Sequence, residues 1–185
     1  MTFPQSHGPW QILARKNVYR DAWIEVDRDE VIRPDGAPGT HCVVRLLPGI
    51  SVLPLDDEGM VYMTEEFHYG VGRRTIEVVS GGIEAGEDAL VAAKRELAEE
   101  LGITAGEWTD LGTCDPFTTI VVSPTRMFFA RRLSYGATTL EGTEQIRCRK
   151  VAFDEAVQMV LDSRITHAPS CVVILKAREA LLIPR

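Results

Sequence analysis

The stretch GGIEAGEDALVAAKRELAEELGI, residues 81–103, decides the fold of this 185-residue chain. It predicts a glycine-containing loop, then a helix, then a stop at Gly102, because glycine accepts the left-handed backbone conformation that commonly ends helices. Glu87 and Asp88 place negative charge at the expected start of the helix, where the helix dipole stabilises it. Leu97 and its apolar neighbours recur at helical spacing, so one face is expected to be buried and the other charged.

The charged face of this helix carries three carboxylates. Glu96, Glu99 and Glu100 stand at i, i+3 and i+4, so they point the same way and repel one another. A divalent cation reverses the sign of that interaction, and carboxylate oxygens suit hard ions such as Mg²⁺ or Mn²⁺. Arg95 can neutralise or orient one carboxylate through a two-pronged hydrogen bond. A solvated acidic helix face is the alternative that the cluster alone leaves open.

The spacing of the whole stretch decides between these alternatives. Gly81, Glu87, residues 95–97 (REL), 99–100 (EE) and 102–103 (GI) stand at the positions of the Nudix box, which the stretch resembles with no position missing. Members of that family hydrolyse nucleoside diphosphates linked to another moiety, with a divalent metal. The resemblance implies an α+β fold, an α/β/α sandwich with a mixed sheet, here preceded by a small N-terminal antiparallel sheet.

The resemblance also implies roles for individual residues. Glu96 and Glu100 are the expected metal ligands, with Glu99 close behind, as a ligand or in catalysis, and the backbone carbonyl of Ser80 is a further candidate. Arg95 either braces the loop against the helix or acts as a catalytic cation. The residues expected to shape the motif are Gly81, Gly82, Glu84, Glu87 and Gly102.

The general base of ADP-ribose-cleaving relatives comes from a later loop, ahead of a strand. Here residues 141–144 (EGTE) precede the strand expected at 145–153. Glu144 stands directly before that strand and is the first choice, with Glu141 second, and a solvated loop acid is the alternative reading. Glu84, inside the glycine-containing loop, either approaches a metal through water or is an exposed acid.

The substrate is less constrained than the chemistry. The region before the box resembles the branch for ADP-ribose and nucleoside diphosphate sugars, although Glu66, His68 and Tyr69 replace the arginine-rich strand end that relatives often carry. Pro116 resembles a proline found downstream of the box in this branch. The candidates for substrate binding are Arg73, Arg74, Arg126, Tyr69 and Pro116; for the arginines, plain surface charge is the alternative.

We therefore expect metal-dependent hydrolysis of the diphosphate bond of ADP-ribose or a related nucleoside diphosphate sugar, giving a nucleoside monophosphate and a sugar phosphate. GDP-mannose, UDP-sugars, NADH and dinucleoside polyphosphates are alternative substrates for the same chemistry. A module that senses a nucleotide without cleaving it is an alternative of another class. Such modules tend to lose box carboxylates, and all of them are present here.

Composition sets further bounds on partners and compartment. The chain is 45% hydrophobic and has a formal net charge of −7, which disfavours a nucleic-acid backbone as partner. Cys42, Cys114, Cys148 and Cys171 form no CxxC pair, so they are expected to be buried free thiols. There is no apolar run long enough to cross a membrane and no signal peptide, so the expected location is the cytoplasm.

The rest of the chain reads as strands, turns and two further helices. Residues 1–48 predict an antiparallel sheet with a turn at 34–36 (PDG), which by resemblance often pairs two subunits into a homodimer. Residues 49–185 are expected to form the Nudix domain. A helix is expected at 154–162, capped by Asp154, and another at 170–182. Strands are expected at 50–55, 60–67, 75–79, 127–133 and 145–153. After Ile103 a polar link is expected to lead to residues 108–114.

Overall fold

The computed structural model of the chain describes residues 2–140 and 145–182. Contacts divide the chain into unit 1, Met1–Leu47 with Asp115–Ser123, and unit 2, Pro48–Cys114 with Pro124–Arg185. The segment Asp115–Ser123 thus joins the N-terminal strands, although it falls inside the range expected to form the second domain.

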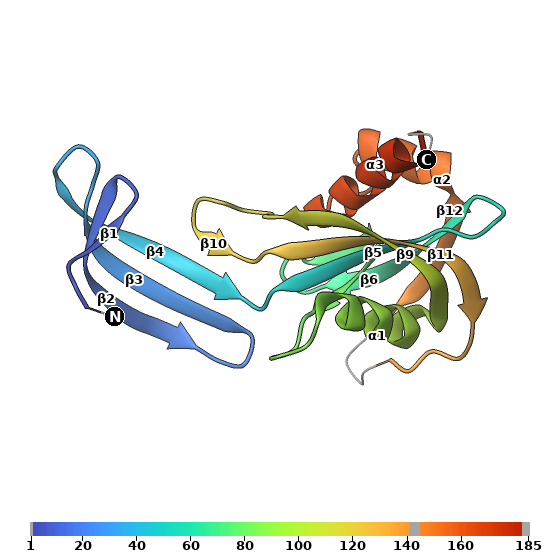
Figure 1. Cartoon of the computed structure of the whole chain (residues 1–185), viewed down its shortest axis with the longest axis horizontal. Helices are drawn as coiled ribbons and strands as arrows, with labels where there is room; N and C mark the ends of the chain where they lie inside the picture. The colour runs from blue at the N-terminus through green and yellow to red at the C-terminus, as the bar shows by residue number, and fades with distance from the viewer. Residues whose placement is uncertain (1, 141–144, 183–185) are drawn as a thin grey trace. The chain divides into compact units, whose positions relative to one another are not determined.

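Unit 1 is an antiparallel sheet with one parallel strand at its edge (Figure 1), in the order β1-β2-β3-β4-β10. Its strands are β1 (Gln5–His7), β2 (Trp10–Arg20), β3 (Ile24–Ile32), β4 (Pro38–Leu46) and β10 (Val121–Val122). The predicted turn between β3 and β4 is confirmed: Arg33 N donates to Ala37 O at 2.9 Å, and Gly36 has a φ of 82°. Only glycine adopts that φ readily, so the PDG sequence sets the hairpin.

Unit 2 is a sandwich of helices and strands. The strand orders are β8-β5-β11-β9 and β12-β6-β7. The strands are β5 (Gly49–Pro54), β6 (Met60–His68), β7 (Arg73–Glu77), β8 (Val79–Gly82), β9 (Ile103–Cys114), β11 (Thr125–Tyr135) and β12 (Arg147–Ala152). The helices are α1 (Ala89–Leu101), α2 (Phe153–Leu161) and α3 (Ala168–Leu182). Strand β11 is parallel to β5 and antiparallel to β9, and α1 covers the face opposite α2 and α3 (Figure 1). The predicted α+β class is confirmed.

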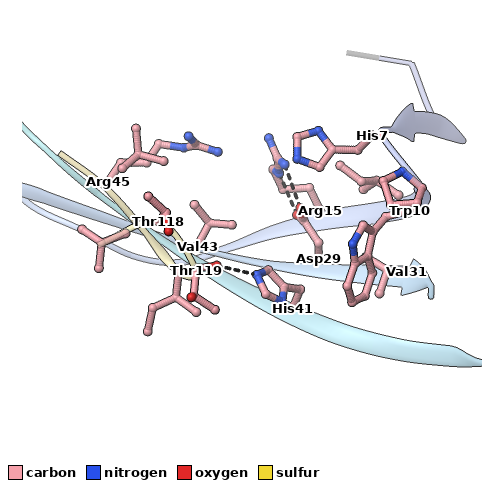
Figure 2. Close-up of a pocket in the computed structure, with 16 residues that line it drawn as sticks. His7, Trp10, Arg15, Asp29, Val31, His41, Val43, Arg45, Thr118 and Thr119 are labelled. Carbon is pink, nitrogen blue, oxygen red and sulfur yellow. Dashed lines mark hydrogen bonds and ion pairs between the residues drawn. The ribbon is translucent and has the colours of Figure 1, made fainter. Parts of the chain in front are cut away.

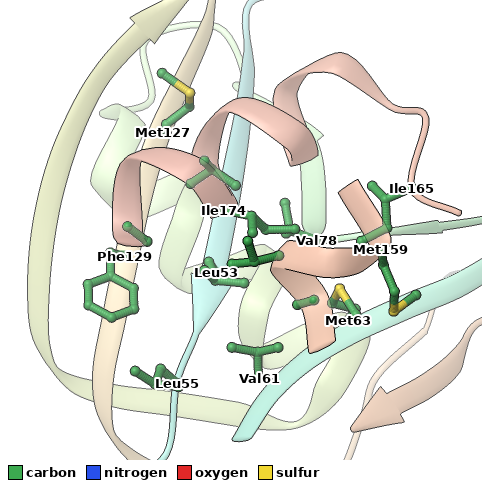
Figure 3. Packing of buried hydrophobic residues seen from close by; sticks show 14 residues of the cluster. Leu53, Leu55, Val61, Met63, Val78, Met127, Phe129, Met159, Ile165 and Ile174 are labelled. Carbon is green, nitrogen blue, oxygen red and sulfur yellow. The ribbon is translucent and has the colours of Figure 1, made fainter. Parts of the chain in front are cut away.

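The central strands are buried on both faces, because helices cover both. Leu53 of β5 and Phe129 of β11 pack with Ile174 beneath α2 and α3 (Figure 3), whereas their neighbours Val52 and Phe128 pack beneath α1. A strand covered on both sides reads as a continuous apolar run. That explains the hydrophobic stretches at 50–55, where Ser51 is the one polar residue, and 127–130.

Some local expectations were wrong. The residue that begins α2 is Phe153, its N-cap position is Ala152, and no side chain caps it, so Asp154 lies inside the first turn instead. Gly81 and Gly82 end strand β8 rather than forming a loop, because they pair with Ile50 and Gly49. The link expected after Ile103 is the first half of the long strand β9.

The cysteines are free, as expected, but not all are buried. Cys42 and Cys148 are exposed, and Cys114 and Cys171 are partly buried. Both exposed thiols lie on strands, β4 and β12, where alternate side chains face outward. No helix among the described residues is long and apolar enough to cross a bilayer.

Candidate active site

Helix α1 is fixed at both ends by the residues that the sequence placed there. Asp88 is the N-cap, and its Oδ1 accepts hydrogen bonds from Leu90 N at 2.9 Å and Val91 N at 3.3 Å. Gly102 is the C-cap with a φ of 63°, and a Cβ there would overlap the backbone oxygen of Gly136. Glycine is therefore required at this position both for its backbone angle and for close approach.

The three glutamates on the acidic face of α1 differ in how much they are exposed to solvent. Glu100 is buried, with 7% of its surface exposed, whereas the side chains of Glu96 and Glu99 are 13% and 40% exposed. The Glu96 carboxylate lies directly against Gly81, so that a Cβ on Gly81 would overlap it. The glycine that ends β8 thus provides the space in which Glu96 sits.

Arg95 connects this face to the segment before the helix. Its Nε and Nη2 donate to the two carboxylate oxygens of Glu87 at 3.1 Å each, and its Nη2 also donates to Gly82 O at 3.0 Å. Its Nη1 donates to Glu96 at 2.8 Å and Glu99 at 3.2 Å. One guanidinium therefore reaches β8, the pre-helix turn and two helix carboxylates.

These contacts shift the ionisation of both partners. The hydrogen bond from Arg95, with a second from Glu84 N at 3.0 Å, holds the pKa of Glu87 below its ordinary value. The same Glu87 carboxylate, with Glu96, raises the pKa of Arg95. Glu84 itself is exposed. Both charges of the Arg95–Glu87 pair thus persist across the neutral pH range.

The donor set on this face fits a hard divalent cation in its chemistry. Three glutamates on one turn of helix supply oxygen ligands of the kind that Mg²⁺ and Mn²⁺ take. The lack of a side chain on Gly81 leaves a space, the Gly81 shelf, that the Glu96 carboxylate occupies. Ser80, whose carbonyl is the further candidate ligand, precedes Gly81 in β8. Among the described residues, however, no three His, Cys, Asp or Glu side chains converge on one point as ligands. In this arrangement Arg95 contacts both Glu96 and Glu99.

The candidates for the general base, Glu141 and Glu144, lie outside the described residues. The chain leading to them is described as far as Leu140. Thr139 N donates to Glu99 O at 2.9 Å, and Gly136 N donates to Gly102 O. The segment after β11 is therefore held along the C-terminal end of α1, beside the acidic face.

The substrate-binding candidates lie on different elements. Tyr69 is 94% exposed in the turn between β6 and β7, and Arg73 and Arg74 begin β7, where Arg73 donates to Thr166 Oγ1 at 2.9 Å. Arg126 is instead paired with Asp110, with Nε 3.0 Å from Oδ1, and this pair holds the pKa of Asp110 low. Pro116 belongs to unit 1.

One polar residue close to the box was not singled out from the sequence. Ser51 Oγ lies 2.9 Å from Ser80 Oγ, and Ser51 is fully buried in β5. The available signal was its position as the polar residue of the otherwise apolar strand sequence ISVLP. A buried hydroxyl in such a strand needs a hydrogen-bond partner.

Unit 1 contains a separate pocket of about 650 Å³, none of whose lining residues comes from the box. Trp10 and His41 both line this pocket (Figure 2). Their ring centroids are 5.7 Å apart, and His41 Nε2 lies 3.2 Å from Thr119 O. Arg15 donates two hydrogen bonds of 2.7 Å to Asp29, which keep the pKa of that buried carboxyl below its ordinary value. The pocket thus combines an aromatic pair with a satisfied ion pair.

Comparisons with known proteins identify the family and the fold. The family model for the NUDIX domain matches residues 45–169, and the model for the nucleoside diphosphate sugar hydrolase N-terminal domain matches residues 10–44. A solved structure described as an ADP compounds hydrolase superposes with a TM-score of 0.82, covering 96% of this chain and 97% of its own, at 20% identity. At that identity the likeness shows the fold, which confirms the predicted sandwich.

Two curated relatives span nearly the whole chain, and a third covers part of it. The ADP-ribose pyrophosphatase of Bacillus subtilis (strain 168) is 27% identical, over 91% of this chain and 94% of the relative. The methanol dehydrogenase activator of Bacillus methanolicus is 25% identical over the same shares. The ADP-ribose pyrophosphatase of Mycobacterium tuberculosis (strain ATCC 25618 / H37Rv) is 30% identical, over 58% of this chain and 54% of the relative. With the domain matched over most of its length and every box position in place, the chain belongs to the Nudix family and is a Nudix hydrolase.

Proposed function

We propose that this Nudix hydrolase cleaves the diphosphate bond of ADP-ribose or a related nucleoside diphosphate sugar, in a reaction that requires Mg²⁺ or Mn²⁺. The products are a nucleoside monophosphate and a sugar phosphate. The names of two relatives, from B. subtilis and M. tuberculosis, support ADP-ribose as the first substrate to test. The match of residues 10–44 to a nucleoside diphosphate sugar hydrolase N-terminal domain supports the broader class.

The observation that carries the proposal is the seat of Glu96 against Gly81. A carboxylate held against a strand end, with Glu99 and the buried Glu100 on the same helix face, concentrates negative charge where the backbone is also accessible. Such a cluster is unfavourable without a cation. Arg95 neutralises part of it, and a divalent ion would neutralise the rest.

The residues have separate tasks in this proposal. Glu96 and Glu100, with Glu99 and the Ser80 carbonyl as further ligands, would hold the metal. Bound there, a divalent metal polarises a phosphoryl oxygen and lowers the pKa of water. Glu144, or Glu141 in its place, would accept the proton of the attacking water. Arg95 would keep Glu87 and the β8 end in place through its hydrogen bonds.

Substrate contacts are proposed for the exposed residues near the turn between β6 and β7. Tyr69 can stack on a base, and Arg73 and Arg74 can bind phosphate or ribose oxygens. Pro116 stays a candidate within unit 1. Arg126 is the weakest candidate, because its guanidinium already binds Asp110.

Unit 1 is proposed as the element that pairs two copies into a homodimer. It leaves large apolar side chains exposed, including Tyr19 of β2 at 52% and Trp23, in the turn between β2 and β3, at 71%. Analytical ultracentrifugation of the wild type and of Trp23→Ser tests this: a wild-type dimer that the substitution weakens is expected, and a wild-type monomer would contradict it.

The function is tested with a panel of nucleoside diphosphate compounds, each assayed with Mg²⁺, with Mn²⁺ and with EDTA, and with products identified by chromatography. The panel contains ADP-ribose, ADP-glucose, GDP-mannose, a UDP-sugar, NADH and a dinucleoside polyphosphate. We expect AMP and ribose 5-phosphate from ADP-ribose, with no product in EDTA. Faster cleavage of another member would change the substrate, and binding without any product would point to a nucleotide sensor.

A further inference from the structure

Val78 is the residue at which the chain leaves one sheet of unit 2 and enters the other. Strand β7, which ends at Glu77, pairs with β6, and β8, which begins at Val79, pairs with β5. Val78 belongs to neither strand, and it is fully buried. A buried residue outside a strand needs other hydrogen-bond partners for its backbone N–H and C=O, because an unpaired polar group in the protein interior destabilises the fold.

Two serine hydroxyls provide those partners. Ser170 Oγ, in the first turn of α3, accepts a hydrogen bond from Val78 N at 3.0 Å. Ser80 Oγ donates to Val78 O at 3.1 Å and lies 2.9 Å from Ser51 Oγ. Since Ser80 has one hydroxyl hydrogen and donates it to Val78 O, Ser51 must be the donor to Ser80. The Ser80 hydroxyl is therefore held between Ser51 and Val78 O, and the carbonyl of the same Ser80 is a proposed metal ligand.

Ser170 is itself held in place. It has no exposed surface, and its Oγ lies 2.9 Å from His167 Nδ1. The same nitrogen lies 3.0 Å from Glu77 Oε2, so it faces both partners. The other oxygen of Glu77 lies 3.3 Å from His68 Nε2 and accepts from Thr75 Oγ1 at 2.6 Å. Ser170 and His167, at the start of α3, therefore contact Val78 and Glu77 respectively.

The side chains at this crossover cannot move independently of the two cores. Val78 packs in the cluster beneath α3, whereas Val79 packs in the cluster beneath α1, and neither has exposed surface. With both side chains fixed, the hydroxyls of Ser170 and Ser80 hold the two peptide groups that flank the Val78 Cα, Glu77–Val78 and Val78–Val79. Ser80 and Gly81, the shelf for Glu96, follow directly along β8.

We propose that Ser170, braced by His167, is a positioning residue of the metal site: it fixes the backbone at Val78 through its N–H and thereby aims the Ser80 carbonyl and places the Gly81 shelf. This inference rests on the proposed metal-dependent function. Residues that orient metal ligands typically change metal affinity 10- to 100-fold when they are replaced. Ser170 lies on the opposite side of the sheet from α1, so it touches none of the proposed ligands' side chains.

The test is Mn²⁺ binding without substrate, followed by electron paramagnetic resonance, alongside the melting temperature of each variant. Ser170→Ala removes the acceptor of Val78 N, and we expect its Mn²⁺ Kd to rise by about tenfold. His167→Ala removes the brace from a partly exposed ring, so it is expected to fold and to weaken Mn²⁺ binding less, in the same direction. Cys171→Ala, the next residue of α3, and Ile174→Val, a core residue of α3, are the controls: they lower the melting temperature without changing the Mn²⁺ Kd.

Each outcome decides a different claim. A Ser170→Ala protein that binds Mn²⁺ like the wild type overturns the inference and leaves the proposed function intact. If Ser170→Ala does not fold, an unchanged Mn²⁺ Kd in His167→Ala overturns it instead. A wild-type protein that binds no Mn²⁺ overturns both the inference and the metal-dependent function. Weaker Mn²⁺ binding in the controls that tracks melting temperature shows a general loss of stability, which also overturns the inference.

Discussion

The Glu96 carboxylate occupies the space that a side chain on Gly81 would fill. This relationship joins the end of β8 to the acidic face of α1 and explains why a glycine and a glutamate fifteen positions apart belong to one motif. Neither residue can be changed without affecting the other. It also gives the first prediction.

Gly81→Ala will displace the Glu96 carboxylate, because its Cβ would overlap that group. We expect Mn²⁺ binding to weaken about 10- to 100-fold and turnover to fall with it. The matched control is Gly106→Ala in β9, where a Cβ meets its nearest neighbour, Arg132 Cβ, at an ordinary 3.5 Å. Equal Mn²⁺ affinity in the two variants would show that the space at Gly81 does not position Glu96 for metal binding.

Arg95→Lys will keep a positive charge but lose the fork that binds both oxygens of Glu87 and the Gly82 carbonyl together. We expect a loss of about 1–3 kcal/mol in the free energy of unfolding, measured by urea denaturation. Arg164→Lys is the control, because its pairs with Asp162 and Glu155 are exposed and screened by solvent, so its stability is expected to match the wild type. A lysine variant as stable as the wild type would show that the fork does not brace the loop.

In Glu77→Gln the free energy of unfolding will fall less steeply than in the wild type as the pH is lowered from 7 to 3. Burial acts to raise the pKa of Glu77, but hydrogen bonds from His167 and Thr75 and the charge of His68 lower it overall from 4.5. A carboxyl with a lowered folded-state pKa stabilises the fold above its unfolded value, and that stability is lost as pH falls through the folded value. We therefore expect the difference between wild type and Glu77→Gln to be largest near pH 7 and to shrink below pH about 4.

Urea denaturation from pH 7 to pH 3 measures this difference, with the exposed Glu179→Gln of α3 as control. The control is expected to follow the wild type at every pH. If the difference in free energy of unfolding between wild type and Glu77→Gln is constant with pH, the charge of Glu77 does not stabilise its contacts at the start of α3.

Glu144→Gln will lower kcat by about 10²- to 10⁴-fold with Mn²⁺ affinity retained, since a general base contributes to proton transfer and not to metal binding. Glu141→Gln is the comparison, and the larger loss identifies the base. Single-turnover rates at saturating Mg²⁺ measure the effect. Full turnover in both variants would place the base elsewhere in the chain.

How far the sequence predicted the structure depends on how local each feature is. The caps of α1 and the turn at 34–36 were predictable, because Asp88, Gly102 and the PDG turn act within a few residues. The hydrogen bond from Val78 N to Ser170 was not predictable, because those residues are 92 positions apart and no sequence periodicity marks a single buried hydroxyl. The pairing of Arg126 with Asp110 was missed for the same reason, since it depends on the register of β9 against β11. Asp154 has the chemistry of a helix cap, but α2 begins one residue earlier than its pattern suggested.

The most direct test of the central claim is ADP-ribose hydrolysis by the wild type and by Glu100→Gln, each with Mg²⁺ and with EDTA, and with Glu179→Gln as control. The account predicts AMP and ribose 5-phosphate from the wild type and the control in Mg²⁺, no product in EDTA, and turnover reduced about 100-fold or more in Glu100→Gln. A Glu100→Gln protein that hydrolyses ADP-ribose at the wild-type rate, or a wild type that is equally active in EDTA, would contradict it.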